Sequence, residues 1–593
     1  MTPPTNPPRA PPREPFKNME VWRVLDGEQL RTLAADHPNQ PLVTHACDGI
    51  RDGMDDTSDF PDLPPRIVPN AKSGLEKPEV LVGEVQGEVI AGRFQPICTA
   101  QDFNSITNGR SWPMGLVKKK TYAGPQRWRP TTNLSKEVAG EPSLNGCMLK
   151  EQLSVSYITP LDCAAAIAQL GDSAAFNKFD QTKAYRQVGR SLAVIHRHMI
   201  TLGGMSYCDR ALSFGSSSAP LQYTAIMSIV SFVIHKALCL KFGEENVVVL
   251  FLLDDLATVL RTKEMADQAY DMVIKIYTDL GFDINEEKSE RGLTEGEWLG
   301  LWFTIPRARG RHMSLPPDKH ASYLGSIKTA RAHDRLMLKF LETLGGRLNY
   351  ACYVFPRMRP YLNELWRLRA GLGDNYFASV KSTQRFRDDM VICQWFLQHG
   401  APRPIAFYES QDFSTDHPVD PGTDGTVAII GDASGDDGFG FASTSGHWGH
   451  SRWTSRHEFD HETPQACKVP AEESSTHQET YCLCAAIATE IEMGTANTTV
   501  SYYTDSRNAA MNWDKGRSKT RAINDLLRAL VPLLYKHGLC LDVRFRHRTD
   551  RFQVVADELS HGRAQTLSSV FPQTSRTVIP VSMTRTMGAW DRL

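Results

Sequence analysis

The feature that most constrains the fold is a pair of aspartates inside a run of strand-forming apolar residues, VVVLFLLDDLATV at 247–259. Apolar residues on both sides of Asp254 and Asp255 predict a β-hairpin that carries two carboxylates out of a buried sheet. Ionised carboxylates beside such a core are costly unless something compensates their charge, and a divalent cation is the obvious candidate. Asp180 ends another short strand-forming run. For the aspartate pair taken alone, a surface turn is the alternative interpretation.

Three carboxylates of this kind favour a particular chemistry. Hard oxygen ligands suit Mg²⁺, with Mn²⁺ as a substitute. Two such ions about 3.5–4 Å apart can activate a primer 3′-hydroxyl and stabilise the leaving pyrophosphate. Metal-dependent nucleotidyl transfer is therefore a chemistry that these carboxylates can support, and the surface turn stays the alternative at this point.

Order and spacing around the aspartates strengthen this interpretation. The chain contains, in sequence, VKKK (117–120), RWRPTTNLS (127–135), SLNG (143–146), KFDQTKAYRQV (178–188), ALSFGSSSAPLQY (211–223), the 247–259 block, LGFDINEEKS (280–289) and EWLGLWF (297–303). This series resembles the fingers and palm motifs of the reverse transcriptase family. The resemblance implies that Asp180, Asp254 and Asp255 are the catalytic metal ligands.

The same resemblance implies a nucleotide-binding set. Lys119 and Arg129 would grip the triphosphate, because a point cation and a planar fork both suit phosphate. Tyr185 would exclude a 2′-hydroxyl, with core packing as its alternative role. Phe214 and Gly215 would lie against the template–nucleotide pair.

Two positions depart from the family pattern. Leu252 stands where Tyr or Phe is usual, and Ser213 stands where Pro is usual. Neither change removes a metal ligand, so we expect altered fidelity or rate with the chemistry intact.

A second group of acids lies in the C-terminal part, each on a different expected element. They are Asp432 at a strand end, Glu479 on the first turns of a helix, Asp505 at another strand end, and Asp557 in the segment 546–561. Any one alone would be a surface acid, but four on one small α/β unit are what two-metal phosphodiester hydrolysis requires.

These blocks resemble the ribonuclease H family, including a histidine ten positions before the last acid. The resemblance implies that Asp432, Glu479, Asp505 and Asp557 hold metals and that His547 helps the product leave. Gln553 occupies a position where Asn is typical, and His561 is a weaker candidate.

The expected fold class is α+β: a right-hand polymerase with fingers, palm and helical thumb or connection, then an α/β ribonuclease H-like domain. The expected segments are a disordered Pro-rich leader (1–20), an N-terminal extension (21–97), fingers and palm (98–305), the helical thumb or connection (306–408), a linker (409–425), the ribonuclease H-like domain (426–565) and a C-terminal tail (566–593). No role is assigned to the insert 456–474.

Composition supports a folded intracellular protein, cytoplasmic or nuclear. The chain has 593 residues and a net charge of −2, but basic residues cluster locally near the proposed catalytic motifs. The twelve cysteines form no CxxC pair, which favours reduced thiols over a disulfide frame or a zinc site. No secretory signal is visible, and the apolar run before Asp254 ends in two acids, so no membrane association is expected.

The function predicted from these resemblances is RNA-directed and DNA-directed DNA synthesis with hydrolysis of RNA in hybrids. Expected partners are an RNA template, a DNA primer, the RNA–DNA hybrid and dNTPs. Lineage features such as NLS…PSLNG and KGRSKTR are similar to tyrosine-recombinase (DIRS-type) retrotransposons, in which another chain would supply a recombinase or capsid-like protein. The rivals are an RNA-dependent RNA polymerase and a decayed copy that only binds.

Overall fold

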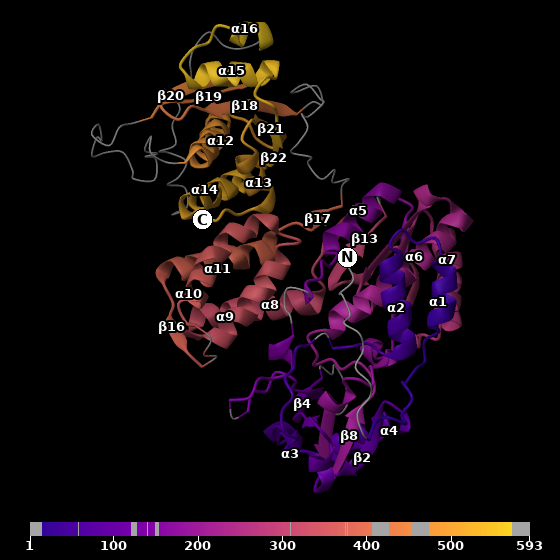
Figure 1. Ribbon diagram of the computed structural model, residues 1–593. Coiled ribbons are helices and arrows are strands. Elements are labelled where there is room, and N and C mark those ends of the chain that lie inside the picture. The colour runs from indigo at the N-terminus through magenta and orange to yellow at the C-terminus, as the bar shows by residue number, and fades with distance from the viewer. Residues whose placement is uncertain are drawn as a thin grey trace. The chain divides into compact units, whose positions relative to one another are not determined.

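The computed structural model describes residues 15–56, 58–119, 127–138, 140–148, 153–306, 308, 310–373, 375, 377–405, 426–453 and 474–571. The chain divides into two compact units (Figure 1). The N-terminal unit comprises Met1–His312 with Pro404–Ala406, and the C-terminal unit comprises Met313–Arg403 with Phe407–Leu593. The expected linker 409–425 lies outside the described residues, as does the insert 456–474 apart from Ser474.

A four-stranded antiparallel sheet, the expected palm, forms the centre of the N-terminal unit. Its order is β11–β6–β10–β9, with bounds Glu290–Leu293, Ala175–Asp180, Asp255–Leu260 and Val247–Leu252. Helices α6 (Ala219–Phe242) and α7 (Lys263–Asp279) pack against this sheet, and α5 (Pro160–Leu170) contacts β9 and β10. Helix α7 begins where the Thr262 hydroxyl accepts a bond from the Met265 N–H.

Helix α6 is unusually apolar. Among the described residues it alone is long and apolar enough to cross a membrane, by length and composition only. Its side chains Tyr223, Ile226 and Ile234 are buried in the core that the sheet and α7 share. The apolar composition of α6 is therefore accounted for by its place in this core.

The segment expected as an N-terminal extension, 21–97, is built into the N-terminal unit. Helices α1 (Gly27–Leu33) and α2 (Gln40–Asp52) pack against each other and against α6. Strands β1 (Arg66–Ile67) and β2 (Phe94–Thr99) are the two edges of a five-stranded sheet, β1–β3–β7–β8–β2. Its other strands are β3 (Arg110–Ser111), β7 (Met199–Leu202) and β8 (Met205–Asp209).

The expected disordered leader, 1–20, needs a correction at its end. Residues 1–14 lie outside the described residues, but Phe16 is fully buried against Phe103, Ile195 and Met199. Burying an aromatic ring supplies the free energy that orders this part of the proline-rich segment.

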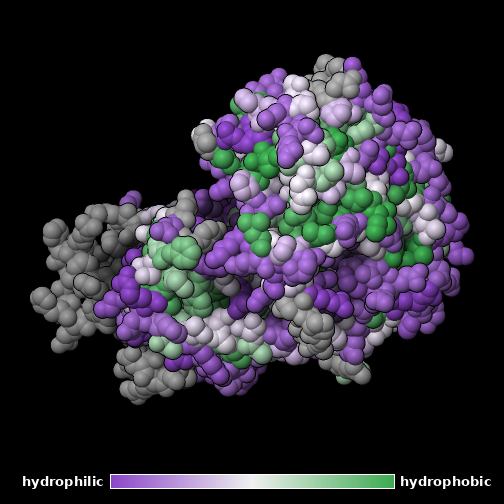
Figure 2. Space-filling model, turned by 90° about the horizontal axis from the view of Figure 1, so that it is seen from below, coloured by the Kyte–Doolittle hydropathy of each residue, from purple (hydrophilic) through white to green (hydrophobic). Residues whose placement is uncertain are grey.

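A second region of this unit carries a hairpin of β4 (Met114–Lys118) and β5 (Trp128–Thr132). Helix α3 (Lys72–Leu75) contacts β4, and helix α4 (Pro78–Ile90) contacts β5. The large exposed apolar side chains of these elements are Leu75, Ile90 and Val117. Figure 2 shows that hydrophobic patches interrupt the otherwise hydrophilic surface seen from below.

The C-terminal unit begins with a mainly helical segment. Its helices are α8 (Pro317–Ala332), α9 (Leu338–Ala351), η8 (Pro356–Leu362), α10 (Asn363–Ala370) and α11 (Gln384–His399). Strands β15 (Arg335–Met337) and β16 (Ser379–Lys381) pair antiparallel within it.

The rest of this unit is a five-stranded mixed sheet with helices on both faces. Its order is β20–β19–β18–β21–β22, with bounds Trp448–Arg452, Gly438–Ser443, Val427–Ala433, Thr499–Thr504 and Cys540–Phe545. The first three strands are antiparallel, whereas β18, β21 and β22 are parallel.

The helices divide between the two faces (Figure 1). One core joins the sheet to α12 (Ser475–Glu492), α13 (Arg507–Lys515) and α14 (Arg521–Lys536), and the other joins it to α15 (Arg551–Ser560). The expected tail needs a correction, because Leu567 and Phe571, at and just after α16 (Leu567–Val570), are buried in the second core.

The helical segment and the sheet domain share a buried boundary within this unit. Arg357 stacks on Trp513, with 3.6 Å from Cζ to the ring centroid. The Tyr361 hydroxyl donates to the Arg528 carbonyl at 2.8 Å, and Arg528 pairs with the fully buried Asp389 at 2.6 Å. The two parts therefore cover each other's polar and aromatic side chains.

Candidate active sites

Strand pairing brings the palm carboxylates together. Asp180, the last residue of β6, lies directly opposite Asp255, the first residue of β10. Leu253 and Asp254 form the two-residue turn between β9 and β10, and Leu253 has a positive φ of 56°. The predicted hairpin and the predicted strand end at Asp180 are confirmed, and they place three carboxylates at one edge of the sheet.

Burial and neighbouring negative charges make Asp254 and Asp255 hard to ionise. Burial raises the pKa of Asp255 to about 6, and the charges of Asp254 and Asp180 add to this. Burial and the Asp180 charge also raise the pKa of Asp254. The Lys288 ammonium lies 2.9 Å from Asp180 Oδ2 and partly balances the group. Oxygen donors that resist ionisation without a counter-charge fit a divalent cation.

Tyr185 and Phe214 face each other near this edge. Tyr185 lies in η4 (Ala184–Gln187), and its ring centroid is 5.1 Å from Phe214 and 5.2 Å from Tyr223. Tyr185 is 8% exposed, whereas Phe214 is 61% exposed. The exposed Phe214 ring therefore lies beside the buried Tyr185 ring. This position fits both predicted roles of Tyr185, exclusion of a 2′-hydroxyl and core packing.

The loop that carries Phe214 is fixed by a residue to which sequence reasoning gave no role. The Asn145 side chain donates to the Gly215 carbonyl at 2.8 Å and accepts from the Ser217 N–H at 2.9 Å. A Cβ on Gly215 would lie 2.2 Å from the Thr132 carbonyl oxygen, so only glycine fits there. Asn145 stands in the SLNG block, but no local pattern predicts a partner seventy residues away.

The two predicted triphosphate ligands belong to the β4–β5 hairpin. Arg129 is exposed on β5, and its charge lowers the pKa of Asp254 against the raising effect of burial. Lys119 follows β4, is exposed, and donates its backbone N–H to the Arg127 carbonyl at 2.9 Å. Arg129 therefore lies close enough to Asp254 for its charge to affect that carboxylate. Lys119 belongs to the same hairpin as Arg129.

The two departures from the family pattern are structurally mild. Leu252 is half-buried and pairs with Asp255 across the hairpin. Ser213 is buried, and its hydroxyl has no hydrogen-bond partner among the described residues. Neither side chain displaces a carboxylate.

A tighter carboxylate cluster lies in the C-terminal domain. Asp432 comes from β18, Glu479 from the second turn of α12, and Asp505 follows β21. Ligand oxygens of these three residues all lie within 4.8 Å of one another, the geometry expected around a metal ion. Among the described residues no other group of three acids, histidines or cysteines meets that criterion.

Two members of this cluster, Asp432 and Glu479, are hard to ionise. Burial and the Asp505 charge raise the pKa of Asp432 to about 6. Burial and the charges of Asp432 and Asp505 raise the pKa of Glu479 well above its ordinary value. Asp432 Oδ1 is buried without a hydrogen-bond partner among the described residues, so this oxygen is suited to ligate a metal ion. The exposed Arg548 pairs with Asp505 at 2.9 Å.

Asp557 and His547 lie at the edge of this cluster. The Asp557 charge contributes to the raised pKa of Asp432, but Asp557 lies outside the group of three. His547 lines an open cleft of about 370 Å³ together with Asp505 and Arg548. Its ring bonds the Thr549 hydroxyl at 2.8 Å.

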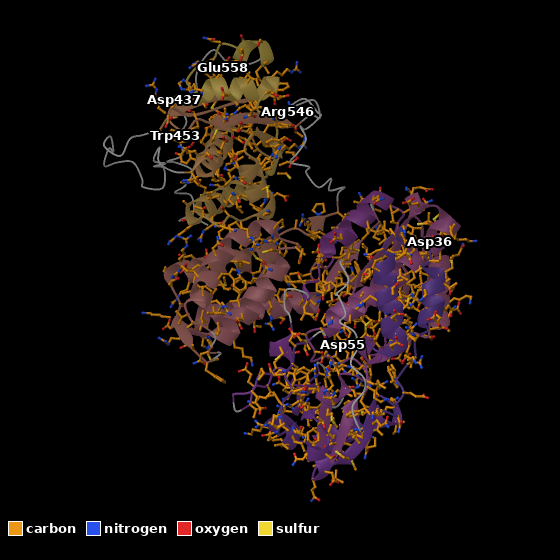
Figure 3. All side chains as sticks on the ribbon, viewed as in Figure 1. Asp36, Asp55, Asp437, Trp453, Arg546 and Glu558 are labelled. Carbon is orange, nitrogen blue, oxygen red and sulfur yellow. The ribbon has the colours of Figure 1, made fainter. Side chains whose placement is uncertain are left out.

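Neighbouring side chains fix the segments that carry these residues. Arg546, labelled in Figure 3, is buried and pairs with Asp550 at 3.1 Å, next to His547. The Gln553 amide donates to the Gly431 carbonyl at 3.1 Å, so it holds the strand beside Asp432. The weaker candidate His561 bonds Asp437. Asp437, labelled in Figure 3, lies in the turn after β18.

Comparison with known proteins agrees with the resemblance of the N-terminal motifs to reverse transcriptases. Residues 117–303 match the family model described as reverse transcriptase (RNA-dependent DNA polymerase). That segment is less than half of the chain and contains the three palm aspartates. The chain thus carries a reverse transcriptase domain. No curated protein matches the sequence.

The solved structures that match this chain include foamy viral protease–reverse transcriptases. One, described as a dRH form in complex with double-stranded DNA, is 14% identical, with 82% of this chain and 72% of that chain covered and a TM-score of 0.46. A complex with RNA/DNA hybrid is 12% identical, with 90% and 65% covered and a TM-score of 0.45. A complex with double-stranded DNA is 12% identical, with 88% and 98% covered and a TM-score of 0.44. Likeness of this degree leaves the activity to be argued from the residues.

Proposed function

We propose that the chain is an RNA-directed and DNA-directed DNA polymerase that also hydrolyses RNA paired to DNA. The observation that carries the polymerase assignment is the register of β6 against β10. It sets Asp180 opposite Asp255 at the turn that holds Asp254, inside the matched reverse transcriptase segment.

At the palm, Asp180, Asp254 and Asp255 would hold Mg²⁺ or Mn²⁺. When bound, the ions supply activation of the primer 3′-hydroxyl and stabilisation of the leaving pyrophosphate. The chain's own contribution is to orient the reactants: Arg129 approaches the aspartates from the β4–β5 hairpin, and Tyr185 with Phe214 bounds the space for the incoming sugar. A bulky ring at Tyr185 leaves no room for a 2′-oxygen.

Primer extension tests this proposal. The full chain is incubated with an RNA template, a DNA primer and Mg²⁺, with dNTPs in one reaction and rNTPs in the other. We expect extension with dNTPs, strong preference over rNTPs, and loss of extension in EDTA. Preferential use of rNTPs would assign the chain to RNA synthesis, and no extension with either would leave a nucleic-acid-binding protein.

The second activity is supported by the convergence of Asp432, Glu479 and Asp505 within 4.8 Å. These residues, with Asp557 beside them, would hold the metal ions that promote attack of water on the RNA phosphodiester. A labelled RNA strand in an RNA–DNA hybrid should be cleaved in Mg²⁺, while the same RNA in single-stranded form should persist. Equal cleavage of both would argue against a hybrid-specific nuclease.

The biological setting follows from these activities as part of the proposal. A chain that synthesises DNA on RNA and then removes the RNA can copy a retroelement, and the lineage features favour a tyrosine-recombinase retrotransposon. Recombinase or capsid-like partners would then be separate chains.

A further inference from the structure

A buried ion network surrounds the residue that follows Tyr185. Arg186 is 6% exposed, and its guanidinium lies between two carboxylates. Nη2 is 2.9 Å from Glu88 Oε2, and Nη1 is 2.6 Å from Asp209 Oδ1. The same group lies over the Phe94 ring, 5.3 Å from its centroid. A planar cation held on three sides has little freedom to move.

Arg186 also connects the two loops that carry Tyr185 and Phe214. Its Nη1 donates to the carbonyls of Ala211 and Leu212, each at 3.3 Å. These carbonyls precede Phe214 by two or three residues, while Arg186 is bonded directly to Tyr185 in the chain. The position of one guanidinium therefore sets the spacing between the two facing rings.

The outer member of the network, Glu88, belongs to helix α4 of the segment 21–97. Its carboxylate binds Arg93 at 2.7 Å and Lys183 at 2.7 Å in addition to Arg186. Burial acts to raise the pKa of Glu88, but Arg93, Arg186 and Lys183 together hold it well below its ordinary range. Glu88 is thus an ionised anchor ninety-eight residues before Arg186 in the sequence.

We propose that Glu88 is a positioning residue for nucleotide selection, acting through Arg186 to hold Tyr185 and Phe214 at the spacing that excludes a 2′-hydroxyl. This inference rests on the proposed DNA polymerase function. Without the Glu88 charge, Arg186 keeps only Asp209 as a close anion, and a buried cation that loses a partner rearranges. A ring displaced by about 1 Å is enough to alter selection strongly.

The test compares Glu88→Gln with Glu79→Gln, a matched change on the exposed side of the same helix. Single-nucleotide addition is measured with dATP and ATP on the full chain, giving kcat and KM for each, together with thermal unfolding. Glu88→Gln should lower the dATP/ATP ratio of kcat/KM by about 5–20-fold, mainly through a lower KM for ATP. Glu79→Gln should match the wild type. An unchanged ratio in folded Glu88→Gln overturns the inference.

A double-mutant comparison separates positioning from general damage. In a Tyr185→Val background the gate is already absent, so adding Glu88→Gln should change the ratio no further. If Glu88→Gln lowers the dATP/ATP ratio by the same factor in the Tyr185→Val background as in the wild type, the inference is overturned. If Glu88→Gln does not fold, Glu88→Asp decides: it keeps the charge on a shorter side chain and should give an intermediate ratio, whereas a wild-type ratio counts against the proposal. Failure of the wild type to extend with dNTPs would refute the polymerase assignment instead.

Discussion

The two carboxylate sites are assembled in different ways. The palm aspartates come from adjacent strands of one sheet and from the turn between two of them, so local pairing is enough to align them. The C-terminal acids come from a strand, a helix and a second strand, and their oxygens converge within 4.8 Å. Asp432 and Glu479 are 2% and 5% exposed, whereas the palm aspartates are half-buried. The palm site needs the pairing of β6 with the β9–β10 hairpin, whereas the C-terminal site depends on the packing of a helix against the sheet.

The largest expected effect is the loss of primer extension when a palm aspartate is replaced. Asp254→Asn removes a charged ligand without changing the shape of the turn, and an amide is a poor replacement for a metal-neutralising carboxylate. Primer extension should fall by at least about 10³-fold, while hybrid hydrolysis stays near wild type. A variant that extends primers normally would overturn the palm assignment.

A smaller effect is expected at the sugar gate. Tyr185→Val opens space beside Phe214 without touching a carboxylate, so the ratio of dNTP to rNTP use should fall by about 10–100-fold. Competition between matched dNTP and rNTP pairs measures the ratio. Hybrid hydrolysis, measured on the same preparation, should not change. A wild-type ratio would leave Tyr185 with packing alone.

The dependence of the C-terminal site on its surroundings can be tested by truncation. A fragment 426–593 lacks Arg357, Tyr361 and Asp389, so Trp513 and Arg528 lose buried partners, whereas a fragment 313–593 keeps them. The shorter fragment should unfold at least about 5 °C lower and cleave hybrid less well. Equal stability would show that the domain folds independently from residue 426, the expected start of the ribonuclease H-like domain.

The smallest effect is on the stability of the metal-free protein. The pKa values of Asp255 and Asp432 are both raised to about 6, above the value near 3.8 of an unfolded chain. The folded state therefore prefers their protonated forms, and the stability they contribute is present below pH 4 and lost as pH rises through about 6. In EDTA at pH 7.5, Asp432→Asn and Asp255→Asn should each raise the melting temperature by about 2–4 °C.

Mg²⁺ and acid supply the controls for that prediction. The gain in melting temperature should shrink as the pH falls below about 5, because the wild-type carboxyls are then protonated as well. Mg²⁺ should stabilise the wild type more than either variant. A variant that is less stable than the wild type in EDTA at pH 7.5 would contradict the electrostatic account of its site.

Sequence reasoning succeeded where the signal is local. The run VVVLFLLDDLATV predicted the β9–β10 hairpin, and the end of β6 at Asp180 followed from the same strand pattern. Strand and helix patterns also placed Asp432, Glu479 and Asp505 on separate elements. What they could not give is the packing that brings those elements to one point, which is a tertiary property.

The residues that sequence reasoning missed act over long separations. Glu88 reaches Arg186 from a helix expected only as part of an extension, and Asn145 fixes a loop seventy residues away. Phe16 looked like part of a disordered leader because proline dominates its neighbourhood, yet its ring is buried. In each case a single side chain contacts a partner that only the tertiary fold brings close. No periodic pattern in the sequence predicts such a contact.

The central claim, two separate metal-dependent sites in one chain, is tested most directly by following both strands of one substrate. A 5′-labelled RNA template and a differently labelled DNA primer are incubated with dNTPs and Mg²⁺, and wild type is compared with Asp505→Asn and Asp254→Asn. The account predicts reciprocal losses: Asp505→Asn extends the primer at nearly the wild-type rate but leaves the RNA intact, and Asp254→Asn cleaves the RNA in a preformed hybrid without extension. Retained RNA cleavage by Asp505→Asn, or loss of both activities in a folded Asp505→Asn protein, would contradict it.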